Sequence, residues 1–148
     1  MSYEIERKVI TNYLQTQSFY GMSPFGLDGE ASNMAAGAGF MTLLSGRAAQ
    51  RSIGAPGANL HDYVGVLAIT IITEGGKGST AGRVTADLIV ADLTGRKLDE
   101  TGGAPSVSSA VVIDFAREGL APYLSSSRPE APNHRTVVHA PFVRTERK

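Results

Sequence analysis

The stretch YVGVLAITIIT, residues 63–73, decides the fold of this chain. It is rich in β-branched residues and is followed by a glycine-rich turn, as is typical of a β-strand. Successive side chains of a strand point to opposite faces, and both faces are apolar here. The first face carries Leu67, Ile69 and Ile71, and the second carries Val64, Val66, Ala68 and Ile72. One pair of helices covers only one face, so we expect the second face to need another sheet, another helix layer or another subunit.

Residues 2–16, at the start of the chain, have helical periodicity. Ser2 is a candidate N-cap, and Glu4 and Glu6 fall in the first turn, where the helix dipole favours anions. The apolar positions recur three and four residues apart, as in a helix packed on a sheet. They are Ile5, Val9, Ile10, Tyr13 and Leu14.

A second helix is predicted directly after the turn that follows the central strand. It begins at Ser79 or Thr80 and ends at Gly95, a residue suited to a helix C-terminus. Its apolar positions are spaced by three, four and three residues, as expected of an amphipathic helix. This stripe consists of Ala81, Val84, Leu88 and Ala91, with Ile89 and Leu93 beside it.

The remaining segments carry weaker signals. Residues 19–58 are predicted to be a partly irregular loop region with two short strands, 39–44 and 48–53, that turn near Ser45 and Gly46. Three C-terminal segments are predicted as strands: 111–115, its continuation or return at 120–124, and 135–143.

The end of the chain is predicted to contain an unusual strand and two polar segments. Pro141 lacks an N–H, so the strand at 135–143 is expected at a sheet edge or at a bulge. Residues 125–133 are expected to form a polar turn, and residues 144–148 a flexible, solvated tail.

The order helix, strands, helix, strands indicates an α+β fold. Short turns between strands favour an antiparallel or mixed sheet with two helices packed on one face. The 148 residues suit a single domain spanning 1–148, and a hydrophobic content of 42% is enough for a core of its own.

Composition and charge exclude several kinds of chemistry. The chain has no cysteine, which rules out disulfides, thiolate metal sites and a cysteine nucleophile. Fourteen Lys and Arg balance fourteen Asp and Glu, so the net charge gives no overall attraction to nucleic acid or anionic lipid. No apolar stretch approaches the roughly 20 residues of a membrane span, and the first residues lack the apolar core of a secretion signal. We therefore expect no membrane partner and no secretion by that route.

The segment most like a catalytic motif is GGKGST, residues 75–80, because it follows a strand and opens a helix. Its spacing differs from that of a phosphate-binding loop. Gly78 separates Lys77 from Ser79, and Ile71 stands where the first glycine belongs. A flexible turn followed by a helix cap is the favoured interpretation.

Histidine and serine residues form no catalytic or metal-binding pattern. His134 and His139 are five apart in sequence, so a strand places them on opposite faces, and His61 is distant. No Gly-x-Ser-x-Gly motif is present, and the serines between 106 and 127 are typical of turns. We expect no enzyme activity, no cofactor, and no catalytic, cofactor-binding or metal site.

Three features together resemble the core of lambda-like phage tail terminator proteins. The central strand has the pattern Tyr-x-Gly-x-Leu-x-Ile, a glycine turn with Lys77 follows, and a helix then ends at Gly95. The closing segment VHAPF, residues 138–142, has the family's apolar Val-x-x-Pro-Phe ending. The resemblance covers most of residues 60–145 and, by layout alone, the first helix. The long segment 19–58 departs from the family's short connection.

The resemblance implies a structural protein of the virion, located in the tail or neck and assembled in the host cytoplasm. Such a subunit forms a ring, typically a hexamer, which caps the tail tube, stops its polymerisation and joins the tail to the head. The implied partners are other copies of the chain, the tail tube protein, the head–tail connector or stopper protein and, as a further candidate, the sheath. DNA passes through the lumen without sequence-specific binding.

The resemblance also implies interface positions. The central strand and the strand containing Pro141 and Phe142 are expected to share one sheet, and the turn at 74–79 is a candidate for ring contact. Arg47 and Arg51 are either a weak polyanion-binding patch or, more commonly for such residues, a solvated face. The candidate subunit or partner interface comprises Arg47, Arg51, Tyr63, Lys77, Arg96, Pro141 and Phe142.

Other functions remain open from the sequence. Within virion structure, the alternatives are a head-completion or stopper protein, another neck protein, or a tube subunit that polymerises openly. A small cytoplasmic binding module would be a monomer or dimer with one concave apolar pocket. An enzyme that uses nucleotide at Lys77 would lose nucleotide affinity in a Lys77→Ala variant.

Overall fold

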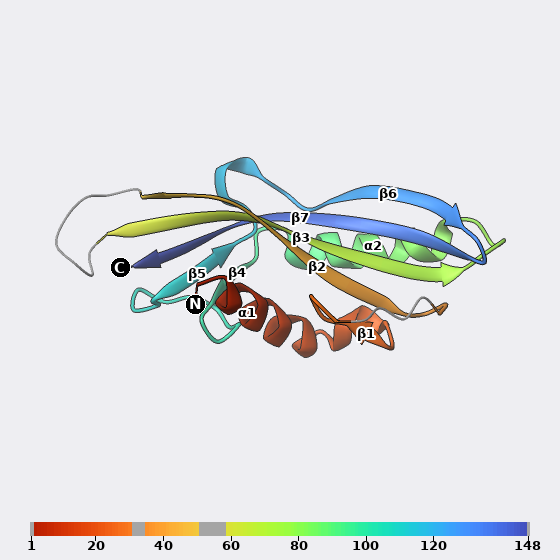
Figure 1. Cartoon of the computed structure of the whole chain (residues 1–148), viewed down its shortest axis with the longest axis horizontal. Helices are drawn as coiled ribbons and strands as arrows, with labels where there is room; N and C mark the ends of the chain where they lie inside the picture. Colours follow the sequence, from red (N-terminus) through yellow and green to blue (C-terminus); the bar gives the residue numbers. More distant parts are fainter. Residues whose placement is uncertain (1, 31–34, 51–58, 148) are drawn as a thin grey trace.

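The computed structural model describes residues 2–30, 35–50 and 59–147 (Figure 1). These residues form two α-helices and one strongly twisted, seven-stranded mixed sheet, which is the α+β arrangement that the sequence predicts. The helices are α1 (Ser2–Thr16) and α2 (Thr80–Leu93), and both agree closely with the predicted ranges.

Two long strands form the centre of the sheet. Strand β3 (Leu60–Glu74) contains the segment that decides the fold, and β7 (Asn133–Arg147) pairs with it antiparallel from Leu60↔Arg147 to Glu74↔Asn133. This pairing confirms that the central strand and the Pro141–Phe142 strand share one sheet.

Shorter strands extend the sheet on both sides. Strands β2 (Gly39–Gln50) and β1 (Phe25–Gly26) continue it beyond β3. On the other edge of β7, strand β6 (Tyr123–Glu130) pairs with its first half, and β5 (Val111–Asp114) pairs with its second half. Strand β4 (Lys97–Asp99) completes this side beside β5.

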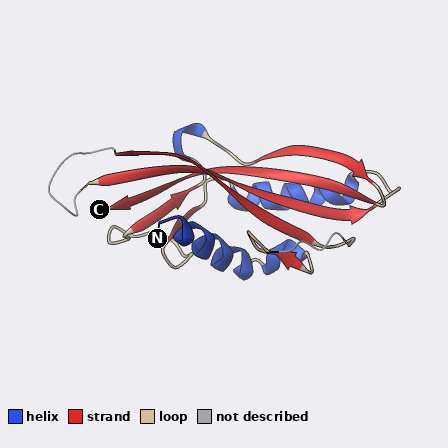
Figure 2. Ribbon diagram, viewed as in Figure 1, coloured by secondary structure: helices blue, strands red, loops and turns tan. Residues whose placement is uncertain are grey.

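Both helices pack on one face of the sheet, α1 beside β4 and α2 along β7 and β6 (Figure 2). The predicted stripe of α1 is confirmed, because its apolar residues from Val9 to Leu14 are almost completely buried. Each buried side chain of this size stabilises the fold by about 1.5–3 kcal/mol. The sheet contributes the other half of the core, including Leu67, Ile69, Ile71, Val138, Ala140 and Phe142.

The region at residues 19–58 contains one long strand where two short ones are predicted. Strand β2 pairs with β3 on both sides of a bulge between Ser45 and Ala48, so the chain bends there and does not turn back. The predicted second strand extends to Ile53, which lies outside the described residues together with Arg51.

The predicted polar turn at 125–133 is mostly strand β6. Glu130 pairs with Asn133, so the hairpin turns through Ala131 and Pro132 alone. The polar residues of β6 misled the prediction because this strand lies at the sheet edge, where alternate side chains face solvent.

The predicted flexible tail at 144–148 is also wrong for the residues that are described. Strand β7 continues to Arg147, and both Arg144 and Glu146 are buried. Their charges suggested solvent exposure, but they pair with each other and with Glu6 inside the protein.

Pro141 lies in a central strand, although the prediction placed it at an edge or a bulge. It pairs with Val66 of β3 on one side. On the other side, pairing with β6 ends at His139 and pairing with β5 begins at Val143. Pro141 therefore occupies the gap between two partner strands, where a missing N–H is tolerated.

Candidate interaction surfaces

The face of the sheet opposite the helices is apolar and only partly covered. Cross-strand pairing places its side chains in rows across β2, β3 and β7, such as Leu44, Val66 and Pro141. We call this surface the open sheet face. It comprises Phe40, Thr42, Leu44, Val64, Val66, Ala68, Tyr123, Val137, His139 and Pro141.

Exposure differs along the open sheet face. Leu44 is 54% exposed, Val64 37% and Tyr123 52%, whereas Thr70 and Ile72 further along β3 are buried. The exposed part lies over the middle of the sheet, and α1 and α2 both lie on the other face (Figure 1). The short 3-10 helix Arg117–Gly119 reaches the border of the open sheet face at Asp62 and Thr145. An exposed, contiguous apolar surface of this kind marks an interaction site more often than scattered apolar residues do.

Charges at the border of the open sheet face are paired. The segment after β5 brings Arg117 over the sheet, where its guanidinium donates to Asp62 at 2.8 Å and to the Thr145 hydroxyl at 3.0 Å. At the other end, Arg135 lies 5.5 Å from the centre of the Phe40 ring and 3.3 Å from Glu130. Arg117 and Arg135 are therefore both paired with a carboxylate, and neither adds an unpaired charge to the apolar part of this face.

A hollow of about 380 Å³ lies in the open sheet face beside the β2 bulge. Its floor is apolar, because it includes Val64 and Val143, and Arg47 and Asp62 stand at its border. The full lining is Arg47, Ala48, Ala49, Asp62, Val64 and Val143.

Helix α2 carries a second uncovered apolar surface, and here the prediction is wrong. The residues buried against the sheet are Gly82, Ala86, Ile89 and Leu93. The stripe that the spacing predicts as the apolar face of an amphipathic helix is exposed to solvent instead, with Val84 56% and Leu88 58% exposed. The helix is apolar on two sides, so periodicity alone selected the wrong one. We call Ala81, Val84, Leu88 and Ala91 the outer stripe of α2.

The close contact between Gly82 of α2 and β7 explains which side of the helix faces the sheet. A Cβ on Gly82 would lie 2.3 Å from the Thr136 hydroxyl, so the small glycine lets the helix approach β7 at that point. The stripe that contains Val84 and Leu88 then points away from the sheet.

The predicted interface residues are spread over different environments. Arg47, Lys77 and Arg96 are exposed, and Pro141 is half-buried on the open sheet face. Lys77 lies 3.1 Å from Glu74 within its turn, and Arg96 lies 3.1 Å from Asp92 at the end of α2.

Two other predicted interface residues lie in the core. Tyr63 is 8% exposed and Phe142 is completely buried, so neither side chain is presented to a partner. Both belong to the helix-covered face, opposite Pro141 and Val64 along their strands.

A buried ionic cluster at the N-terminal end of α1 was not predicted. Arg144 is completely buried; its Nε donates to Glu6 at 2.8 Å, and its Nη1 lies 2.7 Å from a Glu146 oxygen. Its guanidinium carbon is 3.9 Å from the centre of the Tyr63 ring. Burial raises the pKa of Glu6, although the hydrogen bond and charge of Arg144 oppose this change. The cluster joins the first helix to the last strand.

A second unpredicted cluster joins the two helices. Asp92 accepts hydrogen bonds from the hydroxyls of Tyr13, at 2.8 Å, and Tyr20, at 2.6 Å. Burial, together with these bonds to a carboxylate, raises the pKa of both tyrosines. The backbone from Ser18 to Tyr20 has positive φ angles, which is costly for residues other than glycine, so the contact to Asp92 helps to hold this turn.

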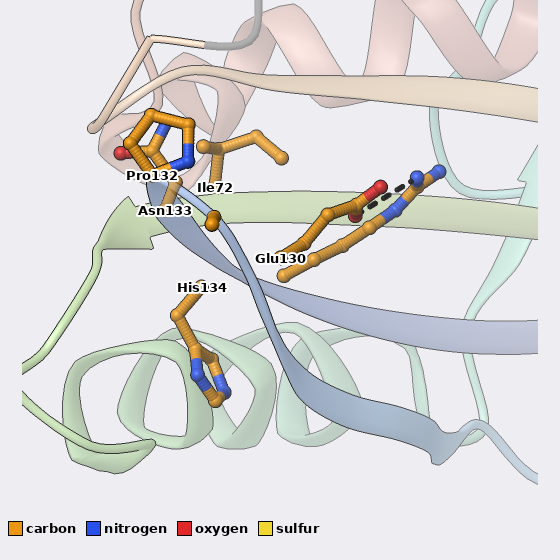
Figure 3. Close-up of a pocket in the computed structure, with 7 residues that line it drawn as sticks. Ile72, Glu130, Pro132, Asn133 and His134 are labelled. Carbon is orange, nitrogen blue, oxygen red and sulfur yellow. Dashed lines mark hydrogen bonds and ion pairs between the residues drawn. The ribbon is translucent and has the colours of Figure 1, made fainter.

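A pocket of about 330 Å³ lies where the β6–β7 hairpin meets the end of β3 (Figure 3). Ile72 and Pro132 form its apolar part, while Glu130 pairs with Arg135 at its side. His134 points away toward α2. There, the Ser127 hydroxyl lies 2.9 Å from His134 Nε2 and 3.3 Å from the Thr136 hydroxyl, which closes a hydrogen-bonded cluster between helix and sheet.

His134 and His139 lie on opposite faces of β7, as the sequence predicts. His139 contacts Tyr123 on the open sheet face, with 3.3 Å between Nδ1 and the hydroxyl. Within the described ranges, no group of three or more His, Cys, Asp or Glu residues is placed to hold a metal ion. No helix in the described part of the chain is long and apolar enough to cross a membrane.

Comparison with protein-family models, with curated proteins and with solved structures finds no match to this chain.

Proposed function

We propose that this chain is a structural subunit of a phage virion, a tail terminator that assembles into a ring at the end of the tail tube. The observation that carries the proposal is a pair of uncovered apolar surfaces, the open sheet face and the outer stripe of α2. A chain of 148 residues that leaves Leu44, Val64, Val84 and Leu88 exposed has surfaces suited to association with further copies.

The order of elements supports the same family. Strand β3 leads through a glycine-rich turn into α2, and the closing strand β7 lies directly beside β3. This is the layout on which the resemblance to lambda-like tail terminators rests. In this proposal the ring caps the tube and contacts the tube protein and the head–tail connector, and DNA passes through its lumen.

Electron microscopy of the purified protein tests the proposal. We expect closed rings of uniform diameter with a central lumen. Open tubes of variable length would indicate a tube subunit, because a heterologous contact that does not close produces filaments. Single particles of one chain at every concentration would contradict a ring-forming role.

A small binding module is the second candidate, and the pocket beside Ile72 and Pro132 favours it. Its volume of about 330 Å³ is at the lower end of the range for small-molecule sites. Such a module binds a compact apolar ligand as a monomer. A screen of small apolar fragments by NMR, with Ile72 methyl shifts as readout, would support this function only if the protein is also monomeric.

A further inference from the structure

We propose that the outer stripe of α2 in one copy packs on the open sheet face of a second copy, with Leu88 entering the hollow beside Val64 and Asp87 pairing with Arg47. This contact is the junction between ring subunits, so it rests on the proposed function. The occupant of the open sheet face is then another copy of the same chain.

The position of the two surfaces favours a head-to-tail contact. Helix α2 packs on one face of the sheet, and its outer stripe points away from it, whereas the open sheet face is the opposite face. Each copy therefore presents one surface to each side. If the outer stripe of one copy packs on the open sheet face of the next, both apolar surfaces become covered. Such a contact is heterologous, and heterologous contacts can close into rings. A two-fold contact of sheet on sheet would leave Val84 and Leu88 exposed.

The chemistry of the two surfaces is complementary. A helix on a sheet is the packing that α2 already uses on its inner side, where Ile89 and Leu93 are buried. The hollow of about 380 Å³ has room for a leucine side chain and an apolar floor of Val64 and Val143.

Charges of opposite sign lie beside the proposed apolar contact on the two surfaces. Asp87 is exposed and precedes Leu88 on the helix, and Arg47 is exposed at the border of the hollow. Arg117 and Arg135, two further cations on this side of the sheet, already lie against Asp62 and Glu130. Arg47 lines the hollow that Leu88 would enter, so it is placed to receive Asp87 of a neighbouring copy, and such pairs fix the register of a contact.

Single variants test each surface. We expect Leu88→Glu on the helix and Leu44→Glu on the sheet to weaken self-association by about tenfold or more, because each puts a charge into an apolar contact. Both positions are more than half exposed, so circular dichroism should show an intact fold. Val107→Glu is the matched control, since Val107 is 98% exposed on a loop outside both surfaces and should associate like the wild-type protein.

Mixing the two variants tests the head-to-tail arrangement. The Leu88→Glu variant keeps an unaltered open sheet face, and the Leu44→Glu variant keeps an unaltered outer stripe of α2. The outer stripe of Leu44→Glu can therefore pack on the open sheet face of Leu88→Glu, which forms one intact junction. We expect each variant alone to have the mass of one chain, 15.6 kDa, and the mixture to contain a 1:1 dimer of twice that mass. If the contact were instead two-fold, sheet on sheet, Leu88→Glu alone would still associate and mixing would not restore association of Leu44→Glu.

Charge exchange tests the register. Arg47→Asp and Asp87→Arg should each weaken association severalfold, and the double variant should recover most of the loss. If the double variant shows no recovery, Asp87 does not face Arg47 and this placement is overturned.

The outcomes distinguish this contact from the proposed function. If the wild-type protein forms rings but the mixture of Leu88→Glu and Leu44→Glu stays monomeric, the contact is overturned and the ring proposal stands. If Val107→Glu loses association while Leu88→Glu retains it, the interface lies elsewhere and the contact is again overturned. If the wild-type protein never associates, both proposals fail.

Discussion

The two faces of strands β3 and β7 have similar chemistry and different surroundings. On the covered face, Leu67, Ile69 and Phe142 are completely buried under the helices, whereas on the open sheet face Val64 is more than one third exposed. Leu, Ile and Phe predominate on the covered face, and Val, Ala and Pro on the open one. Side-chain volume, and not polarity, therefore separates the intramolecular core from the surface available to a partner.

The largest expected effect comes from placing a charge on each face in turn. Ile69→Asp should abolish the fold, at a cost of about 4 kcal/mol or more, because the carboxylate would lie in a cluster of hydrophobic side chains. Val66→Asp, on the open sheet face of the same strand, should keep a cooperative urea unfolding transition and lose only association. Equal loss of the fold in both variants would show that the two faces are not distinct.

A second variant tests whether charged residues belong to the covered face. Arg144→Ala leaves the buried Glu6 and Glu146 without their cation, so we expect a loss of about 3–5 kcal/mol in the free energy of unfolding. Arg147→Ala, at an exposed position of the same strand, is the control and should change stability little. Similar results for the two variants would mean that β7 does not continue into the core as described.

The inner and outer sides of α2 can be compared in the same way. Asp92→Asn weakens the hydrogen bonds from Tyr13 and Tyr20, and we expect a loss of about 2 kcal/mol measured by urea denaturation. Asp87→Asn, on the exposed side of the helix, should leave the stability of the monomer unchanged. A larger loss of unfolding free energy in Asp87→Asn than in Asp92→Asn would contradict the orientation of α2 in which Asp92 contacts Tyr13 and Tyr20 and Asp87 faces solvent.

The smallest expected effect is a dependence on pH. The raised pKa of Glu6 means that the folded protein binds its proton more tightly than the unfolded protein does. Its contribution to stability is complete below pH 4.5, the ordinary glutamate value, and is lost as pH rises through the folded-state pKa. Relative to Glu6→Gln, the wild-type protein should therefore gain stability as pH falls from neutral toward 4.5.

The control for this measurement is Glu4→Gln, an exposed position on the same helix. The difference in unfolding free energy between the wild-type protein and this variant should stay constant over the same pH range. A constant difference for Glu6→Gln as well would contradict a raised pKa at Glu6.

Much of the fold could be predicted from residue patterns. The ranges of both helices, the central strand and the apolar character of both its faces follow from periodicity and β-branched content. The continuation of β7 could not be predicted, because Arg144 and Glu146 resemble a solvated end until their pairing with Glu6 is known.

The candidate surfaces were predicted only in part. The uncovered face of β3 was expected from alternation alone. The outward orientation of Val84 and Leu88 was not, because α2 is apolar on two sides and its rotation depends on the contact between Gly82 and Thr136. The hollow beside the bulge requires the pairing register of β2, which no local pattern shows.

The mass of the wild-type chain in solution, compared with that of Leu44→Glu across the micromolar range, most directly tests whether the open sheet face is covered by another copy. We expect several times 15.6 kDa for the wild-type protein and a single chain for the variant. A wild-type mass of 15.6 kDa at every concentration would contradict the account.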